Sequence, residues 1–174
     1  MTEIKLQKNL VGSILDIGGG GEGVIGRIYG AQVMAIDNRQ EELDEAPDGF
    51  EKRLMDAADL RFPDGCFDHV TSFFTLMFMD EATQRDAIRE AARVLKPGGQ
   101  LHIWDAAIAS AWPEPFCIDL AIDAAGQSIQ TTYGVGKLGS QSAGSLESLC
   151  LASGLIRQEC TVQNECFHLI FLKP

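Results

Sequence analysis

A buried strand that runs directly into a glycine-rich turn constrains the fold of this chain more than any other feature. The segment ILDIGGGGEG, residues 14–23, joins an apolar run to five glycines and a following helical pattern. Glycine lets the backbone bend sharply and approach a ligand closely, and the start of the next helix presents free amide N–H groups. The segment therefore predicts a nucleotide-type binding site at the carboxyl end of a strand.

Further apolar runs predict a parallel sheet around this turn. Strands are expected at residues 13–17, 32–36, 50–55, 67–73, 100–104, 156–162 and 166–172. The first two are separated by enough chain for a crossover helix, whereas the last two are joined by a turn too short for one, so they must be antiparallel. We expect an α/β fold: a Rossmann-like, mostly parallel seven-stranded sheet with an antiparallel C-terminal hairpin and helices on both faces.

Two helices and a lid complete the expected domain. A helix should run from Glu81 to Leu95, capped by Asp80, and another should begin after Ser145 as N-cap and end at Ser153. Between them the periodicity weakens over residues 107–144, which we interpret as a lid with a mobile, glycine-rich second half. The 174 residues then form one domain, because domains usually hold about 100 to 200 residues.

Composition limits the partners and the compartment. A formal charge of -11 repels phosphate backbones, so no nucleic acid is expected as a partner. No apolar run reaches the roughly 20 residues of a membrane span, and the segment MTEIKLQKNL lacks the apolar core of a secretory signal. Five cysteines without a CxxC pair predict reduced thiols and no metal site. We expect a cytoplasmic protein that does not bind membranes.

Two classes of cofactor compete for the glycine turn. Gly18, Gly20 and Gly23 satisfy the GxGxxG spacing of dinucleotide-binding proteins, and Asp37 follows at a suitable distance. Asp16 favours the other class, because a carboxylate at the strand exit attracts an ammonium group and repels a pyrophosphate. S-adenosylmethionine (SAM) carries an ammonium group and no phosphate.

These residues resemble the class I SAM-dependent methyltransferases, in particular the small-molecule enzymes related to those of ubiquinone and menaquinone biosynthesis. Besides the glycine turn, MDAADLRFPDGCFD at 55–68 resembles the family's motif after the third strand, and RVLKPGGQLHIWD at 93–105 resembles its helix-to-strand signature. The three motifs occur in the family's order over about half the chain. The implied activity is transfer of a methyl group from SAM to a small molecule by in-line displacement.

The resemblance also implies roles for individual residues. It places Asp16, Gly18, Gly19 and Gly20 around the methionine part of SAM. Asp37, with Asn38 beside it, would hold the ribose hydroxyls, because a carboxylate can accept two hydrogen bonds from a diol. Asp56 and Ala57 would bind the adenine. Phe73 and Phe74 would form the wall near the methyl group, and one of them should be only core, because adjacent strand residues point to opposite faces.

The chain departs from the family in two places. Glu22 stands where the family usually has glycine, and only about a dozen residues precede the first expected strand, where the family usually has helices. A carboxylate facing the methionine carboxylate would weaken binding. The missing helices leave the cofactor less covered unless the lid or a second subunit, as in a homodimer, supplies the cover.

Catalysis by such an enzyme depends mainly on alignment of the reacting groups. If the acceptor must lose a proton, Asp105 and Tyr133 are the candidate bases. Three histidines, at 69, 102 and 168, fall within strand patterns and are interpreted as structural. Two alternatives remain: a SAM-binding sensor or complex subunit without transferase activity, and a nicotinamide-dependent oxidoreductase, which Asp16 and the lack of a second mononucleotide-binding half disfavour.

Overall fold

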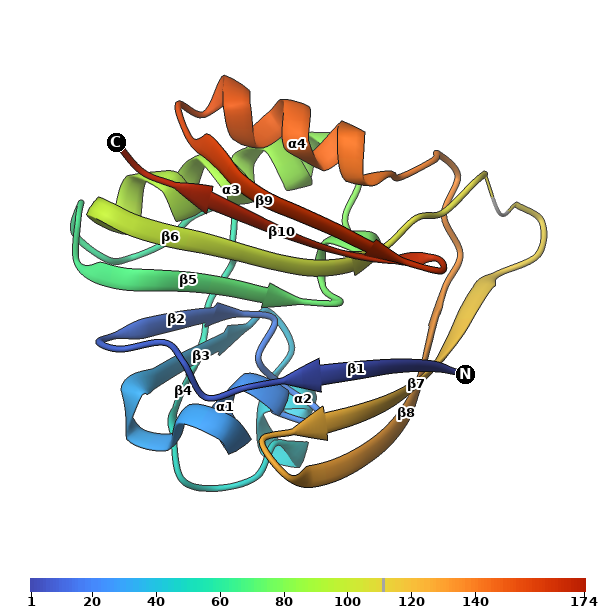
Figure 1. Cartoon of the computed structure of the whole chain (residues 1–174), viewed down its shortest axis with the longest axis horizontal. Coiled ribbons are helices and arrows are strands. Elements are labelled where there is room, and N and C mark those ends of the chain that lie inside the picture. Colours follow the sequence, from blue (N-terminus) through green and yellow to red (C-terminus); the bar gives the residue numbers. More distant parts are fainter. Residues whose placement is uncertain (111) are drawn as a thin grey trace.

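The centre of the molecule is a seven-stranded sheet with the strand order β4-β3-β2-β5-β6-β10-β9 (Figure 1). It is seen in a computed structural model that describes residues 1–110 and 112–174. The strands are β1 (Thr2–Leu6), β2 (Ile14–Ile17), β3 (Val33–Asp37), β4 (Glu51–Leu54), β5 (Phe67–Phe73), β6 (Leu95–Ala106), β7 (Phe116–Ala124), β8 (Gln127–Val135), β9 (Ile156–Gln163) and β10 (Cys166–Leu172). The α-helices are α1 (Val24–Tyr29), α2 (Gln40–Glu45), α3 (Glu81–Val94) and α4 (Ala143–Ala152).

The topology confirms the predicted fold. Strands β4, β3, β2, β5 and β6 are parallel, and β10 runs antiparallel between β6 and β9. Helices cover both faces, with α3 and α4 packed on one apolar core and α1 packed on the other. This division follows from the alternation in β2, where Leu15 and Ile17 face α3 and Ile14 faces α1.

A second, three-stranded sheet was not predicted. Strands β7 and β8 form an antiparallel hairpin within the expected lid, and β1 pairs parallel with β7 over Thr2–Leu6. The alternation of β7 buries Ile118, Leu120 and Ile122, within the segment that was expected to be a lid. We call this sheet of β1, β7 and β8 the roof. Figure 1 shows it beside α1, toward the carboxyl ends of β2 and β3.

The start of helix α3 agrees with the prediction, whereas the start of helix α4 does not. The Asp80 carboxylate caps α3 as expected, accepting a 2.8 Å hydrogen bond from the Thr83 amide. Helix α4, in contrast, begins three residues earlier than predicted. Its N-cap is Ser142, and Ser145 is the third helical residue of a reciprocal capping box rather than the cap itself.

Among the described residues, no helix combines the length and apolarity needed to cross a bilayer.

Candidate functional site

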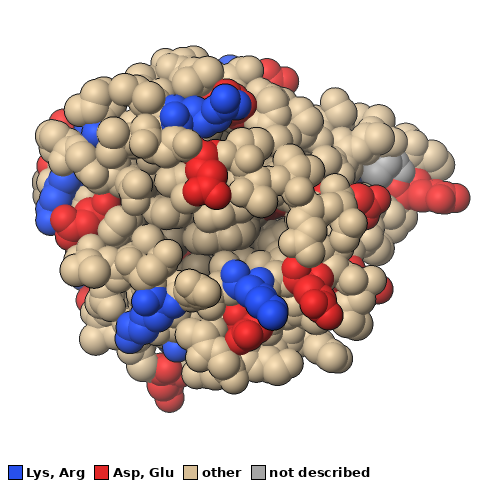
Figure 2. Space-filling view, in the orientation of Figure 1, with Lys and Arg blue, Asp and Glu red and all other residues tan. Residues whose placement is uncertain are grey.

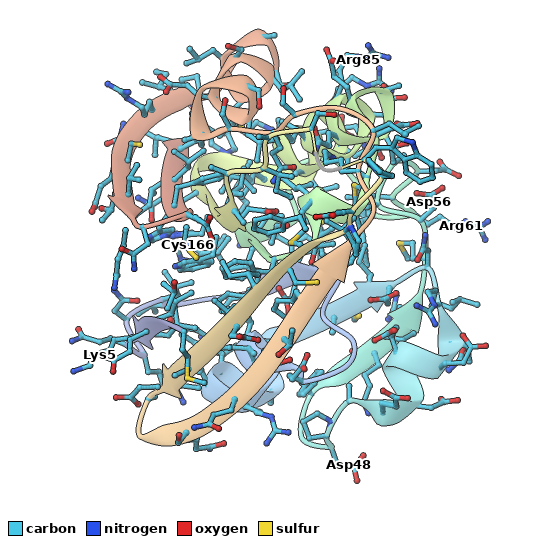
Figure 3. All side chains as sticks on the ribbon, turned by 90° about the vertical axis from the view of Figure 1, so that its right-hand side faces the viewer. Lys5, Asp48, Asp56, Arg61, Arg85 and Cys166 are labelled. Carbon is cyan, nitrogen blue, oxygen red and sulfur yellow. The ribbon has the colours of Figure 1, made fainter. Side chains whose placement is uncertain are left out.

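A cavity of about 740 Å³ lies along the carboxyl edge of the large sheet. It falls within the roughly 300–1,000 Å³ typical of small-molecule sites. The sequence-predicted residues that line it are Gly18, Gly20, Asp37, Asn38, Asp56, Ala57, Phe73, Phe74 and Tyr133. Asp16, Gly19 and Asp105 do not line it. Figure 3 looks toward this edge, with the β7–β8 hairpin crossing in front.

The glycine turn is shaped so that only glycine fits at its critical positions. Gly18 has a φ of 71°, and a Cβ there would collide with the Thr75 side chain. A Cβ at Gly20 would come within 2.6 Å of the Glu42 Cβ atom. The turn is held to the neighbouring strand by the Gly18 and Gly19 amides, which both donate to the Ile36 carbonyl, at 2.8 and 3.0 Å. The backbone is therefore close enough to the cavity for direct contact with a ligand.

Asp16 supports the glycine turn from a buried position that does not line the cavity. Its carboxyl group is buried, and Oδ1 accepts a 2.7 Å hydrogen bond from the Thr71 hydroxyl of β5. Burial raises the pKa of Asp16 to about 7, and the Thr71 hydrogen bond opposes that shift. At neutral pH the group is therefore close to its titration midpoint, and a nearby cation would favour its ionised form.

Asp37 is the last residue of β3 and Asn38 follows it, and both line the cavity. The Asp37 Oδ1 atom accepts a 3.0 Å hydrogen bond from the Arg39 amide, a turn that fixes the carboxylate at the strand end. Its backbone carbonyl accepts from the Met55 amide at 2.9 Å, which joins the ends of β3 and β4. Asp37 thus presents a carboxylate between the glycine turn and the segment that carries Asp56.

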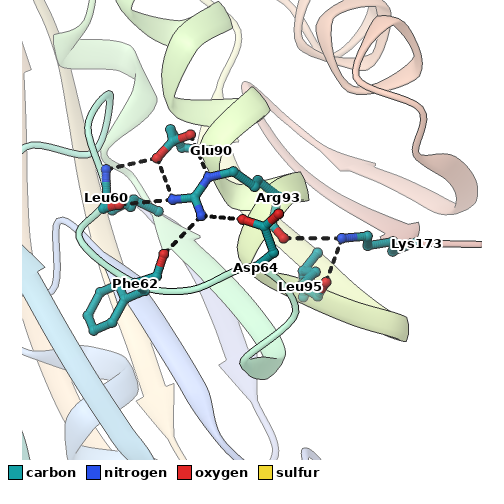
Figure 4. A network of polar contacts seen from close by, with 7 residues as sticks. All are labelled: Leu60, Phe62, Asp64, Glu90, Arg93, Leu95 and Lys173. Carbon is teal, nitrogen blue, oxygen red and sulfur yellow. Dashed lines mark hydrogen bonds and ion pairs between the residues drawn. The ribbon is translucent and has the colours of Figure 1, made fainter.

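The segment of residues 55–66 reaches the cavity without a helix of its own, and Arg93 of α3 holds it in place (Figure 4). The Arg93 guanidinium donates to the Leu60 and Phe62 carbonyls, both at 2.9 Å, and to Asp64 at 2.7 Å. Glu90 pairs with the same guanidinium and accepts from the Leu60 amide at 2.9 Å.

The anchored segment presents Asp56 and Ala57 to the cavity. Asp56 is exposed at one side of Figure 3, whereas Ala57 is buried beside the main core. Within the segment, the Asp56 Oδ1 atom accepts a 2.9 Å hydrogen bond from the Ala58 amide. The exposed Asp56 carboxylate and the buried Ala57 methyl group thus form one part of the cavity wall.

Phe73 and Phe74 both line the cavity, so the expectation that one is only core was wrong. Phe74 lies just beyond β5 with a φ of 49°, and the alternation of the strand no longer applies to it. A positive φ is strained for a bulky residue and marks a position that its surroundings hold in place. Its ring stacks on Tyr133, with centroids 5.6 Å apart and an interplanar angle of 21°.

Tyr133 brings the roof into the site. The Tyr133 hydroxyl donates to the Glu22 carboxylate at 3.2 Å, and the Thr131 hydroxyl also donates to Glu22. Burial and the Glu22 charge raise the pKa of the Tyr133 phenol well above its usual range. The phenol is therefore a hydrogen-bond donor at neutral pH, which makes it a poor base.

Asp105 lies outside the cavity in a buried polar network. Its carboxylate accepts from the Met77 amide at 3.2 Å and from the Gln141 side-chain amide at 2.8 Å. Burial raises its pKa to about 6, and these hydrogen bonds oppose the shift. In this structure the group joins β6 to the segment before α4 and has no surface on the cavity.

Three further lining residues, Ile17, Gly21 and Glu22, belong to the predicted glycine segment 14–23, and Glu22 was expected to face the methionine part. The lining residues that the sequence did not indicate are Ile36, Arg39, Glu42, Glu45, Met55, Thr75, Phe78, Met79, Thr83 and Thr132. Phe78 and Met79 could have been predicted, because they follow the carboxyl end of β5, where ligands bind in parallel sheets. Thr132 had no such signal, because its place depends on the unpredicted roof.

The sequence matches a known family and two curated proteins. The model described as "Methyltransferase domain" matches residues 15–103. A demethylmenaquinone methyltransferase of Thermus thermophilus is 40% identical over 85 residues, which cover 48% of this chain and 36% of that protein. An O-methyltransferase of Aspergillus sclerotiorum is 31% identical over 114 residues, which cover 59% of this chain and 42% of that protein. The matched regions thus span less than half of either relative.

The fold matches solved structures over nearly the whole chain. An S-adenosylmethionine-dependent methyltransferase from Mesorhizobium loti superposes with a TM-score of 0.65 over 92% of this chain and 90% of that chain. The two sequences are 18% identical, so this likeness speaks for the fold alone.

Proposed function

Because this chain belongs to the methyltransferase domain family, we propose that it is an enzyme that transfers a methyl group from SAM to a small-molecule acceptor. The observation that carries the proposal is the single cavity wall formed by the glycine turn, Asp37, Asp56 and the end of β5. All four lie within the matched residues 15–103. Most of the groups that were assigned to one cofactor thus line one cavity, although Asp16 and Gly19 do not.

The residues present fit SAM in chemical terms. The glycine turn offers close backbone contact for the methionine part, and the Asp37 carboxylate, with Asn38, can accept hydrogen bonds from the ribose diol. Asp56 can accept a hydrogen bond from an exocyclic amine, and Ala57 gives an apolar contact for the adenine ring. When bound, SAM supplies an electrophilic methyl group on a positively charged sulfur.

The chain's own contribution to the reaction is alignment and exclusion of water. Phe73, Phe74, Phe78 and Met79 give the cavity an apolar wall beyond the glycine turn, where the acceptor is expected. Holding a nucleophile in line with the methyl group converts a bimolecular reaction into an effectively unimolecular one. These side chains would hold the acceptor beside the electrophilic methyl group and keep water away from the reacting atoms.

Of the two candidate bases, only Tyr133 touches the cavity, and it holds its proton at neutral pH. Asp105 is occupied by buried hydrogen-bond donors. We therefore propose that alignment, rather than general-base catalysis by either residue, supplies the rate enhancement. An acceptor whose nucleophile is already deprotonated, or loses its proton to water, fits this site best.

The nature of the acceptor is supported by charge and by the relatives. The acidic surface, with 25 Asp and Glu against 14 Lys and Arg, disfavours a nucleic-acid acceptor. The two curated relatives carry the names of an O-methyltransferase and a demethylmenaquinone methyltransferase, which favours a small organic molecule here. All five cysteines are free thiols, which supports a reducing, cytoplasmic location.

Titration calorimetry tests the cofactor assignment directly. The purified chain should bind SAM and should not bind NAD at matched concentrations. Turnover is then tested with methyl-labelled SAM and a panel of small phenols, quinols and carboxylates, by counting label in the extracted product. Uptake of NAD in place of SAM would contradict the proposal. Tight SAM binding without turnover on any acceptor would instead favour a SAM-binding protein without transferase activity.

A further inference from the structure

A carboxylate that has no cationic partner among the described residues lies in the cavity wall, between the glycine turn and the roof. Glu22 is half-buried and lines the cavity beside Gly21. Its two oxygens accept hydrogen bonds from the hydroxyls of Thr131 and Tyr133, both on β8. These donors are neutral, so they hold the carboxylate in place without cancelling its charge.

Basic side chains do not compensate Glu22 within the described part of the chain. Arg27 directs its Nε to the backbone carbonyl of Glu22 at 2.6 Å, and no ion pair joins the two side chains. The cavity wall as a whole carries the carboxylates of Glu22, Asp37, Glu42, Glu45 and Asp56. Arg39 is the basic residue of that wall, and it pairs with Glu42 at 3.1 Å.

Such a wall should distinguish ligands by charge. In a partly enclosed site the attraction between a carboxylate and a cation is stronger than in bulk water. If the chain acts as proposed above, it meets two nearly identical ligands that differ in this respect. SAM carries a positive sulfonium, whereas S-adenosylhomocysteine, left after the carbon–sulfur bond breaks and the methyl group moves to the acceptor, has a neutral thioether sulfur.

We infer that Glu22 is a specificity-determining residue that favours the sulfonium cofactor over its neutral product. The inference rests on the proposed function. Loss of the positive charge in the reaction then weakens the attraction to Glu22, which promotes release of the product and entry of new cofactor. Thr131 and Tyr133 act as positioning residues, because they fix the carboxylate against the cavity. Repulsion between Glu22 and the methionine carboxylate, which both ligands carry, would affect both ligands equally. The same holds for a purely structural role, in which Glu22 only ties the glycine turn to the roof.

Calorimetric affinities of the full chain for SAM and for S-adenosylhomocysteine separate these roles. In Glu22→Gln, which keeps the size and polarity of the side chain, affinity for SAM should fall roughly tenfold, while affinity for S-adenosylhomocysteine changes less than about twofold. Retained binding of the product also shows that the variant is folded. In Tyr133→Phe, which keeps the carboxylate and removes one of its two hydrogen bonds, the preference for SAM should fall in the same direction but by less than in Glu22→Gln.

A matched control and a salt series complete the test. Glu41→Gln removes an exposed carboxylate that does not line the cavity, and it should leave both affinities unchanged. In the wild type, the preference for SAM should shrink as sodium chloride rises from about 50 to about 500 mM. Equal weakening of both ligands in Glu22→Gln, or no weakening of either, overturns the inference while the proposed function stands. A wild-type chain that binds neither ligand overturns both.

Discussion

Asp16 and Asp37, at the ends of neighbouring parallel strands, differ in chemistry because one is buried and the other is partly exposed. Asp16 and Asp37 follow the same apolar pattern in sequence, and both were predicted to face one cofactor. The structure buries Asp16 against Thr71 and raises its pKa, whereas Asp37 is partly exposed and lines the cavity. Asp37 can therefore contact a ligand directly, and Asp16 acts through its charge and through the turn above it.

Replacing Asp37 with alanine should weaken SAM binding while the fold survives. Loss of a charge-assisted hydrogen bond costs about 1.5–3 kcal/mol, which is roughly a ten- to hundredfold loss of affinity. Calorimetry gives the affinity, and circular dichroism checks the fold. Glu41→Ala is the control, because this carboxylate lies on α2 outside the cavity. Unchanged binding in Asp37→Ala would show that the ribose partner is assigned to the wrong residue.

Asp16 should make SAM binding depend on pH. Its pKa is raised to about 7 in the folded chain, and a cationic ligand favours the ionised form, so binding should release a proton. We expect SAM affinity to rise between about pH 6.0 and pH 7.5, below the titration of the ligand's own α-amino group near 7.7–8.0. The profile of Asp16→Asn should be flat over this range. Parallel profiles for the two proteins would assign the dependence to another group.

At the scale of secondary structure elements, local patterns predicted some parts well and others not at all. Strands β5 and β10 were predicted to the residue, because each is a continuous apolar run bounded by charged or turn residues. The roof was missed because β1 pairs with β7 across more than a hundred residues, and no local pattern encodes that contact. The shared cavity was predictable because its main residues follow parallel strands, which end at one edge.

Arg93 should be the residue of α3 on which the segment 55–66 depends. Arg93→Ala removes hydrogen bonds to two backbone carbonyls and the ion pairs to Asp64 and Glu90. Because the guanidinium is partly exposed, we expect a loss of about 2 kcal/mol in the free energy of unfolding, together with weaker SAM binding. Urea denaturation and calorimetry measure the two effects.

Arg85 of the same helix offers the matched control for Arg93. It is an exposed residue, labelled in Figure 3, whose contact with Asp86 spans 3.8 Å. Arg85→Ala should change the free energy of unfolding by less than about 0.5 kcal/mol. Similar losses in the two variants would mean that removing any arginine from α3 has this effect, and that the hydrogen bonds of Figure 4 contribute little.

For the whole molecule, the two faces of the sheet are covered unequally. Helices α3 and α4 cover one face, while on the other α1 and the roof share a core with Phe73 of β5, Ala106 of β6 and Cys166 of β10, and no described helix lies in front of β6 and β10 in Figure 1. Figure 2 shows few charged side chains over this region. A row of stacked rings occupies it, including His102, and the Trp104 and His168 rings lie 4.1 Å apart. The sequence predicted histidines in strands but gave no sign that they would stack.

This row should make the fold sensitive to acid. Burial lowers the pKa of His102 to about 3, so only the unfolded chain takes up its proton as pH falls below about 6.5. The free energy of unfolding therefore falls on acidification. Protonation of His102 in the unfolded chain accounts for about 2 kcal/mol of this fall at pH 5. In His102→Phe, the free energy of unfolding from urea denaturation should fall less between pH 7 and pH 5 than in the wild type.

Comparing the wild type with His102→Phe isolates the contribution of His102 to the pH dependence. Asp16 and Asp105 have raised pKa values, so they act in the opposite direction over this range, but they do so in both proteins. The difference between the two pH dependences then belongs to His102 and its ring neighbours. Identical slopes would show that protonation of this row does not govern the response to acid.

The pairing of β1 with β7 has a consequence for how a substrate reaches the cavity. Five consecutive register pairs, from Thr2 with Leu120 to Leu6 with Ala124, bind the two strands into one ladder. The hairpin that carries Tyr133 therefore cannot swing outward as an independent flap. Either the whole three-stranded sheet tilts as a body, or the ladder breaks first, and amide hydrogen exchange along Thr2–Leu6 would then quicken in step with that of β8.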